Sequence, residues 1–206
     1  MKNLISRMQT QLNALVKKYP AAAEELGLSF ELNAGASEAD FAELEQTLGY
    51  ALPEEFKELY RVANGETDID GVFAGEEWLS IDRIIDEYNI WQELYQNGTS
   101  QEDDGTPYGC EPEAGIKPDF WWNPKWISLT ADGSGNSKMI DLDPSEQGTA
   151  GQIIQMWHDD AAREKVADSL REFLQNYVRD LEAGLYVLDA EYGVILQSEL
   201  DDLNDE

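Results

Sequence analysis

Two punctuated helices in the first third of the chain constrain the fold more than any other feature of this sequence. Ser37 can cap the first helix, with Asp40 as its partner three residues later, and Gly49 stands where that helix should end. Pro53 opens the second helix, where its missing N–H costs nothing, and the pair Asn64-Gly65 ends it. Each helix is apolar along one side only, so both stripes need a further layer to cover them. We expect that layer to be a sheet.

The rest of the chain supplies this sheet and further helices. Apolar runs bounded by Gly, Asn and Asp predict strands, and apolar residues at helical spacing predict helices. Residues 99–118 show neither pattern, and their Gly, Pro and acidic residues predict a long surface loop. We expect a helix at 2–19 that Pro20 ends, a short strand at 78–79 followed by a helix through 81–91, strands at 125–130, 138–143 and 151–158, a helix at 163–183, a hairpin within 185–197 and a frayed acidic tail at 198–206.

This order of elements predicts an α+β fold. Helices gather early and late, and the short connections between the strands favour an antiparallel-rich sheet packed with helices. A length of 206 residues suits a single domain with appendages. We expect an N-terminal helical extension at 1–36, the main domain at 37–187, and an acidic C-terminal hairpin and tail at 188–206.

The charge of the chain restricts its partners. The sequence has 43 acidic and 14 basic residues, a formal net charge of −29. Such a surface repels nucleic acid and anionic lipid, because both are bound largely through their phosphates. It attracts basic proteins and speeds their encounter. We therefore expect a protein partner, no nucleic acid and no membrane; solubility or adaptation to high salt is the other explanation for the charge.

The sequence carries few signals of a cellular compartment or of catalytic chemistry. No apolar run approaches the ~18 residues that span a bilayer, and residues 1–20 lack the apolar block of a signal peptide. Cys110 is the single cysteine and His158 the single histidine, too few for a disulfide framework or a usual zinc site; no G-x-S-x-G elbow is present, and the acidic surroundings of Cys110 disfavour a reactive thiolate. We expect a cytoplasmic protein that is not an enzyme and uses no cofactor or metal.

One loop has a partial calcium pattern. Asp132, Ser134, Asn136 and Asp143 fall at positions 1, 3, 5 and 12 of a calcium loop, but Ser137 stands where such a loop needs Gly. The flanking segments are also expected strands rather than helices. We interpret this stretch as a tight β-turn, with weak calcium binding left open.

An acidic segment followed by aromatic residues has the composition of a protein interface. Trp and Tyr anchor interfaces, and charges at the rim steer the encounter. The alternative is a solvated loop followed by core tryptophans. The candidate partner-binding residues are Glu102, Asp103, Asp104, Tyr108, Glu111, Glu113, Trp121 and Trp122.

Four blocks in order resemble the SUKH superfamily, which includes the Smi/Knr regulators of cell-wall assembly. They are "LGYALPEEFKELYRVANGE", "WNPKWISLTADGSGNSKMIDLDP", "GTAGQIIQMWHDD" and "SLREFLQNYVRDLEAGLY", and the resemblance covers residues 38–187. The matching positions are Leu52, Pro53, Asn64 and Gly65 in the helix block and Trp126, Asp132, Gly133, Gly135, Asn136 and Asp141 in the strand-turn-strand block.

The resemblance implies a non-catalytic α+β domain in which these matching residues are mostly structural. Many bacterial members act as immunity proteins against polymorphic toxins, often nucleases, whereas the fungal members are regulators with long disordered arms. Because this chain shows no low-complexity arms, we expect an immunity protein that neutralises a basic, nuclease-type toxin. The alternative is an intracellular regulatory scaffold linked to cell-wall assembly.

Overall fold

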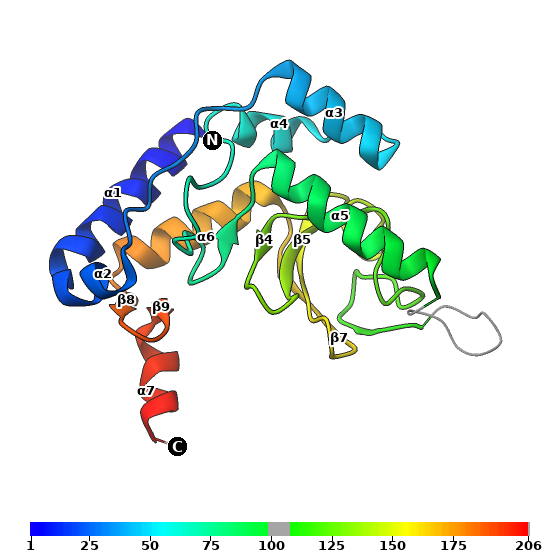
Figure 1. Cartoon of the computed structure of the whole chain (residues 1–206). Coiled ribbons are helices and arrows are strands. Elements are labelled where there is room, and N and C mark those ends of the chain that lie inside the picture. The colour runs from blue at the N-terminus through cyan, green and yellow to red at the C-terminus, as the bar shows by residue number, and fades with distance from the viewer. Residues whose placement is uncertain (99–107, 206) are drawn as a thin grey trace.

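The structure is a computed structural model, and it describes residues 1–98 and 108–205 (Figure 1). The helices in this part of the chain are α1 (Lys2–Lys18), α2 (Pro20–Leu26), α3 (Glu38–Leu48), α4 (Glu54–Tyr60), α5 (Ile81–Gln96), α6 (Leu170–Glu182) and α7 (Gln197–Asp205). The strands are β1 (Glu77–Trp78), β2 (Glu111–Pro112), β3 (Trp126–Ser128), β4 (Thr130–Ala131), β5 (Ser137–Asp141), β6 (Gln152–Met156), β7 (Ala162–Ala167), β8 (Tyr186–Asp189) and β9 (Gly193–Leu196).

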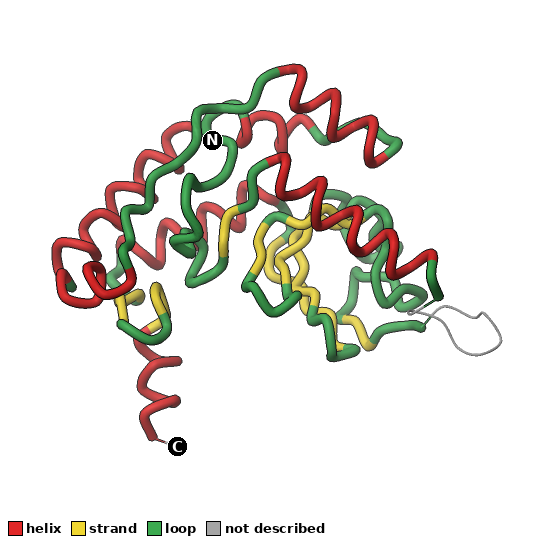
Figure 2. Tube along the Cα trace, in the orientation of Figure 1, coloured by secondary structure: helices red, strands yellow, loops and turns green. Residues whose placement is uncertain are grey.

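A five-stranded sheet forms the middle of the fold. Its order is β2-β7-β6-β5-β3, and every pair is antiparallel except β2 with β7. All five residues of β6 are buried, as expected for a central strand covered on both faces. Strand β1 pairs with β4, and β8 pairs with β9 in a separate hairpin (Figure 2). These two pairs lie outside the five-stranded sheet. The predicted α+β class is confirmed.

The N-terminal helix is part of the same core. Its apolar stripe is buried, and α1 lies beside α6 along much of its length (Figure 1). One continuous cluster of buried side chains runs from Leu4 in α1 to Val194 in β9. The family-like region therefore shares its core with the segments on either side, and the division at residues 36 and 187 stays a prediction. The buried stripe of α1 is Leu4, Ile5, Met8, Leu12 and Leu15.

The signals at the start of α3 and α4 act as predicted. Ser37 Oγ accepts a hydrogen bond from Asp40 N at 3.3 Å, and Asp40 Oδ2 accepts one from Ser37 N at 2.7 Å, which completes a capping box. Gly49 follows α3 with φ +77°, the left-handed conformation that favours glycine. Pro53 stands directly before α4.

The pair Asn64-Gly65 was wrongly predicted to end this helix, because α4 ends at Tyr60. Gly65 is buried with φ +74°, and a Cβ there would lie 2.5 Å from Ser80 N and 2.7 Å from the carbonyl carbon of Leu79. Asn64 Oδ1 accepts a hydrogen bond from Ile81 N at 2.8 Å. The pair thus fixes a close crossing between the exit of α4 and the entry to α5.

Two further sequence predictions were wrong, and a third was correct but incomplete. Residues 162–167 form strand β7 rather than the first turn of a helix, and Ser169 caps α6 by accepting a hydrogen bond from Glu172 N. Pro20 ends α1 but also opens α2, where it occupies the first turn. The acidic tail forms helix α7, which buries none of its side chains.

Candidate functional site

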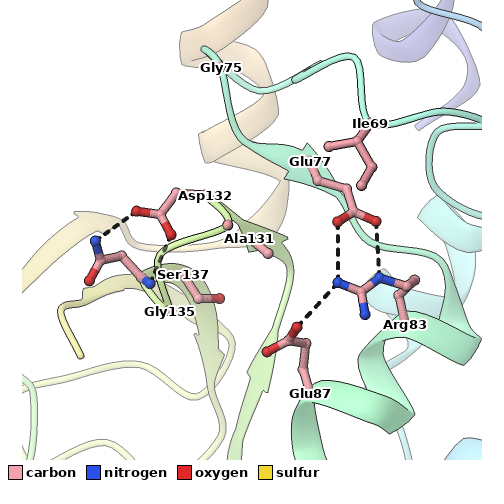
Figure 3. Close-up of a pocket in the computed structure, with 11 residues that line it drawn as sticks. Ile69, Gly75, Glu77, Arg83, Glu87, Ala131, Asp132, Gly135 and Ser137 are labelled. Carbon is pink, nitrogen blue, oxygen red and sulfur yellow. Dashed lines mark hydrogen bonds and ion pairs between the residues drawn. The ribbon is translucent and has the colours of Figure 1, made fainter.

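A pocket of about 250 Å³ lies between helix α5 and the turn that joins β4 to β5 (Figure 3). The pairing of β1 with β4 places Glu77 opposite Ala131, and so beside this turn. Helix α5 contributes the remaining charged side chains from its first two turns. The lining residues are Ile69, Gly75, Glu77, Arg83, Glu87, Ala131, Asp132, Gly133, Gly135, Asn136 and Ser137.

The turn at one side of the pocket is organised by Asp132. Its Oδ1 accepts hydrogen bonds from Ser134 N at 2.8 Å and Asn136 N at 3.0 Å, and its Oδ2 accepts one from Asn136 Nδ2 at 2.7 Å. Asn136 Oδ1 in turn accepts from His158 N at 2.9 Å, which ties the turn to the end of β6. Gly135 has φ +104°, and a Cβ there would lie 3.1 Å from the ring of His158. The Asp132 carboxylate is therefore already engaged within its own turn.

The opposite side of the pocket has two carboxylates around one guanidinium. Arg83 contacts Glu77 through Nε at 3.3 Å and donates from Nη2 to Glu87 at 3.2 Å (Figure 3). Burial raises the pKa of Glu87 above its ordinary value, and the neighbouring Arg83 opposes that shift. With Asp132, whose carboxylate is bound within its own turn, the pocket lining has three carboxylates and a single arginine. The pocket lining therefore carries an excess of negative charge.

The single histidine and the single cysteine of the chain offer limited chemistry. His158 is exposed, and its Nδ1 lies 3.7 Å from Asp159. Burial raises the pKa of the Cys110 thiol, which lowers its reactivity as a nucleophile. Within residues 1–98 and 108–205, no group of three or more His, Cys, Asp or Glu side chains is placed to hold a metal ion.

The predicted partner-binding residues are only partly brought together. Glu102, Asp103 and Asp104 lie outside the described residues. Tyr108, Glu111 and Glu113 are exposed, and Glu113 Oε2 accepts a hydrogen bond from Lys165 N at 2.9 Å.

The two tryptophans of this candidate set have different environments. Trp121 is half-buried, and the guanidinium of Arg163 lies 5.1 Å from its ring centroid. Trp122 is only 1% exposed and stacks on Trp91 with ring centroids 6.3 Å apart. The prediction that Trp122 offers an accessible anchor is corrected: its ring belongs to the core, and Tyr88 and Tyr95 pack around it.

The residues that match the SUKH pattern take structural positions. Trp126 Nε1 donates to Asp141 Oδ1 at 3.0 Å, and Gln152 Nε2 donates to Asp141 Oδ2 at 2.8 Å, so a fully buried carboxylate is satisfied by its neighbours. Burial raises the pKa of Asp141. Leu52 is also buried. Of this set, Asp132, Gly133, Gly135 and Asn136 line the pocket.

Sequence reasoning missed Ile69, Glu77, Arg83 and Glu87. The signal for the last two was present, because Arg83 and Glu87 stand four residues apart on a predicted helix, a spacing at which opposite charges pair. Ile69 and Glu77 gave no comparable signal. The place of Glu77 beside the turn depends on the long-range pairing of β1 with β4.

Comparison with known proteins identifies a family. The model of the SMI1 / KNR4 family (SUKH-1) matches residues 35–176, more than half of the chain. KNR4/SMI1 homolog 2 of Debaryomyces hansenii is 31% identical over 85% of this chain and 35% of its own length. The cell wall assembly regulator SMI1 of Saccharomyces cerevisiae is 23% identical over 78% of this chain and 38% of its own length.

A third relative matches a similar share of the chain. The cell wall biosynthesis/cell cycle regulator smi1 of Schizosaccharomyces pombe is 28% identical over 75% of this chain and 32% of its own length. The chain thus spans about a third of the length of these relatives. Among the described residues, no helix combines the length and the apolar character needed to cross a membrane.

Proposed function

The chain belongs to the SMI1 / KNR4 family (SUKH-1), and on that premise we propose that it is a non-catalytic domain that binds a basic protein. Relatives in this family are named as regulators of cell-wall assembly or biosynthesis rather than as enzymes. A role as a binding domain agrees with those names. A cytoplasmic location is part of the same proposal.

The charge supports a basic partner. The chain carries a net charge of −29, and the pocket beside α5 is lined by three carboxylates and one arginine. Opposite charges on two proteins speed their encounter and disfavour wrong partners. This excess of acid, on the surface as a whole and at the pocket, is the observation that carries the proposal.

In its specific form, the proposal is an immunity protein that neutralises a toxin of the nuclease type. A nuclease must present basic side chains to nucleic acid, so an acidic protein can occupy the same surface. The acidic segment that includes Glu102, Asp103 and Asp104 is proposed to steer this encounter. The second candidate is a regulatory scaffold, which is favoured by the names of the fungal relatives.

Affinity capture with the purified chain separates these roles. Capture is performed at about 0.1 M salt, where the Debye length is about 10 Å, and at about 1 M salt, where it is about 3 Å. An immunity protein should retain one tight basic partner whose recovery falls at high salt. A scaffold should retain several partners of moderate affinity.

Coexpression then tests toxicity. The recovered partner is expressed in a host with and without the chain, and growth is measured. Growth arrest that the chain relieves supports immunity, and a harmless partner supports the scaffold. Recovery of acidic or uncharged partners that is insensitive to salt would contradict the proposal as a whole.

A further inference from the structure

Two neighbouring pockets share the residues Ile69 and Gly75. The first is the pocket beside α5 described above. The second has a volume of about 230 Å³ and lies where the end of α2, the loop at 67–76 and the β8–β9 turn meet. Ile69 therefore stands between two hollows on one continuous surface. The second pocket is lined by Leu26, Leu28, Ile69, Asp70, Gly71, Gly75, Glu191, Tyr192 and Gly193.

Ile69 is exposed to an unusual degree. Its relative exposure is 77%, the highest among the large hydrophobic side chains that the structure describes as exposed. Figure 3 shows it beside Glu77, on the side of the pocket away from the Asp132 turn. Tyr192 and Leu26, at 43% and 38%, extend the apolar surface across the second pocket. A single exposed side chain needs no explanation, but an apolar ridge between two pockets does.

The loop that carries Ile69 is held in place from below. The buried carboxylate of Glu66 accepts hydrogen bonds from Asp70 N at 3.1 Å, Gly71 N at 3.2 Å and Val72 N at 2.9 Å. Asp70 Oδ2 accepts a further hydrogen bond from Ser29 N at 3.1 Å. The backbone on either side of Ile69 is thus ordered before any partner arrives. The loop that presents Ile69 therefore loses little backbone entropy on binding.

The charges around this surface select the partner. The two pockets together contain five carboxylates (Asp70, Glu77, Glu87, Asp132 and Glu191) and one basic side chain, Arg83. A second copy of the chain would bring like charges together, which costs several kcal/mol at an interface. A basic protein brings the opposite charge. Apolar contact at the centre with charge complementarity at the rim is the usual anatomy of a protein interface.

We propose that Ile69 and the two pockets beside it form the docking surface for the basic protein partner. A lysine or arginine side chain of the partner enters the first pocket and is bound between Glu87 and the Asp132 turn. An apolar side chain next to it packs on Ile69 and Tyr192. This inference rests on the proposed function and locates the binding surface away from Trp122.

The first test uses a defined probe. A ten-residue peptide of alternating lysine and leucine is titrated into ¹⁵N-labelled full-length chain, and the amide resonances of residues 69–75 and 132–137 are followed. A lysine-only peptide of equal charge controls for simple charge attraction. Shifts concentrated at these two segments, and larger for the lysine-leucine peptide, are expected. Equal shifts spread over the whole acidic surface, with either peptide, would overturn the proposal.

The second test uses the partner recovered by low-salt capture. Ile69→Ala should weaken binding about tenfold, the loss expected when a central interface residue is truncated. Leu203→Ala is the matched control, because it deletes the same number of carbons from an exposed residue of α7. Glu87→Gln should also weaken binding, whereas Glu43→Gln, the same charge change at an exposed position of α3, should have a much smaller effect.

The outcomes of this second test separate the two proposals. Wild-type affinity in both Ile69→Ala and Glu87→Gln would overturn the docking surface while leaving a basic partner in place. Failure to recover any basic partner would refute the proposed function itself. Ile69 is exposed, so an unchanged melting temperature is expected for Ile69→Ala, whereas Glu87 is partly buried and pairs with Arg83, so the folding of Glu87→Gln is checked by its melting temperature before its affinity is compared.

Discussion

Replacement of Gly65 by alanine tests the crossing on which the site depends. The positive φ of +74° costs a residue with a Cβ about 1–2 kcal/mol. The new Cβ would also lie 2.5 Å from Ser80 N and 2.7 Å from Trp78 O, and relieving such a contact by moving backbone costs about 1–3 kcal/mol. The sum is a loss of about 2–5 kcal/mol in the free energy of unfolding.

Gly49 supplies the matched control. It has φ +77°, but a Cβ there would meet nothing within 4 Å. Gly49→Ala should therefore cost only the conformational part, about 1–2 kcal/mol. The difference between the two variants isolates the steric part.

Urea denaturation measures both variants. Tryptophan fluorescence is followed at equilibrium, and the free energies of unfolding are obtained by linear extrapolation. If Gly65→Ala lost no more stability than Gly49→Ala, the close approach of residue 65 to the start of α5 would be refuted.

Four further predictions follow from the same structure. Burial raises the pKa of Glu66 from 4.5 to about 7. Between these pH values the folded state holds a proton that the unfolded chain releases, so the contribution of Glu66 to stability falls as pH rises from about 4.5 to about 7. Glu66→Gln should remove this part of the pH dependence of the free energy of unfolding, measured by urea titrations at several pH values. Trp122→Ala should lower the free energy of unfolding by about 3–5 kcal/mol, because it truncates a core side chain. A loss below about 1 kcal/mol in the same assay would contradict the burial of its ring. Calorimetry with calcium or zinc should show no binding tighter than roughly millimolar, and micromolar affinity would contradict this. Neutralising Glu102, Asp103 and Asp104 together should slow association with the basic partner in stopped-flow measurements at low salt, relative to neutralising three acids of α7; equal rates would locate the steering charges elsewhere.

Local signals in the sequence were sufficient where one residue fixes the backbone by itself. The capping box of Ser37 and Asp40, the left-handed Gly49 and the position of Pro53 were all predicted correctly, because each acts within a single turn. Strand β7 shows the limit of such reasoning. Its Val166 continues the apolar spacing of α6, but pairing with β6 makes the segment a strand, and the cap at Ser169 marks the true start of the helix.

The candidate site was harder to predict than the elements around it. Its pocket joins a loop, a helix and a turn that are separated by up to about seventy residues of sequence. The Asp132 turn could be recognised from its Gly and Asn content, but nothing local indicates that Glu77 and Ile69 lie beside it. The aromatic residues at 121–122 led to a wrong prediction of an accessible anchor, because composition does not indicate which face of a segment is covered.

The packing of α1 against α6 has a consequence for how the chain is made. About 150 residues separate the two helices, so α1 leaves the ribosome long before its partner exists. At roughly 5–20 residues per second, its apolar stripe waits about 8–30 s for α6 to emerge. During that interval Met8 and Leu12, which are fully buried in the native state, have no native surface to cover them. The nascent chain should therefore depend on chaperones through most of its synthesis, and truncation before α6 should yield an aggregating product rather than a smaller folded domain.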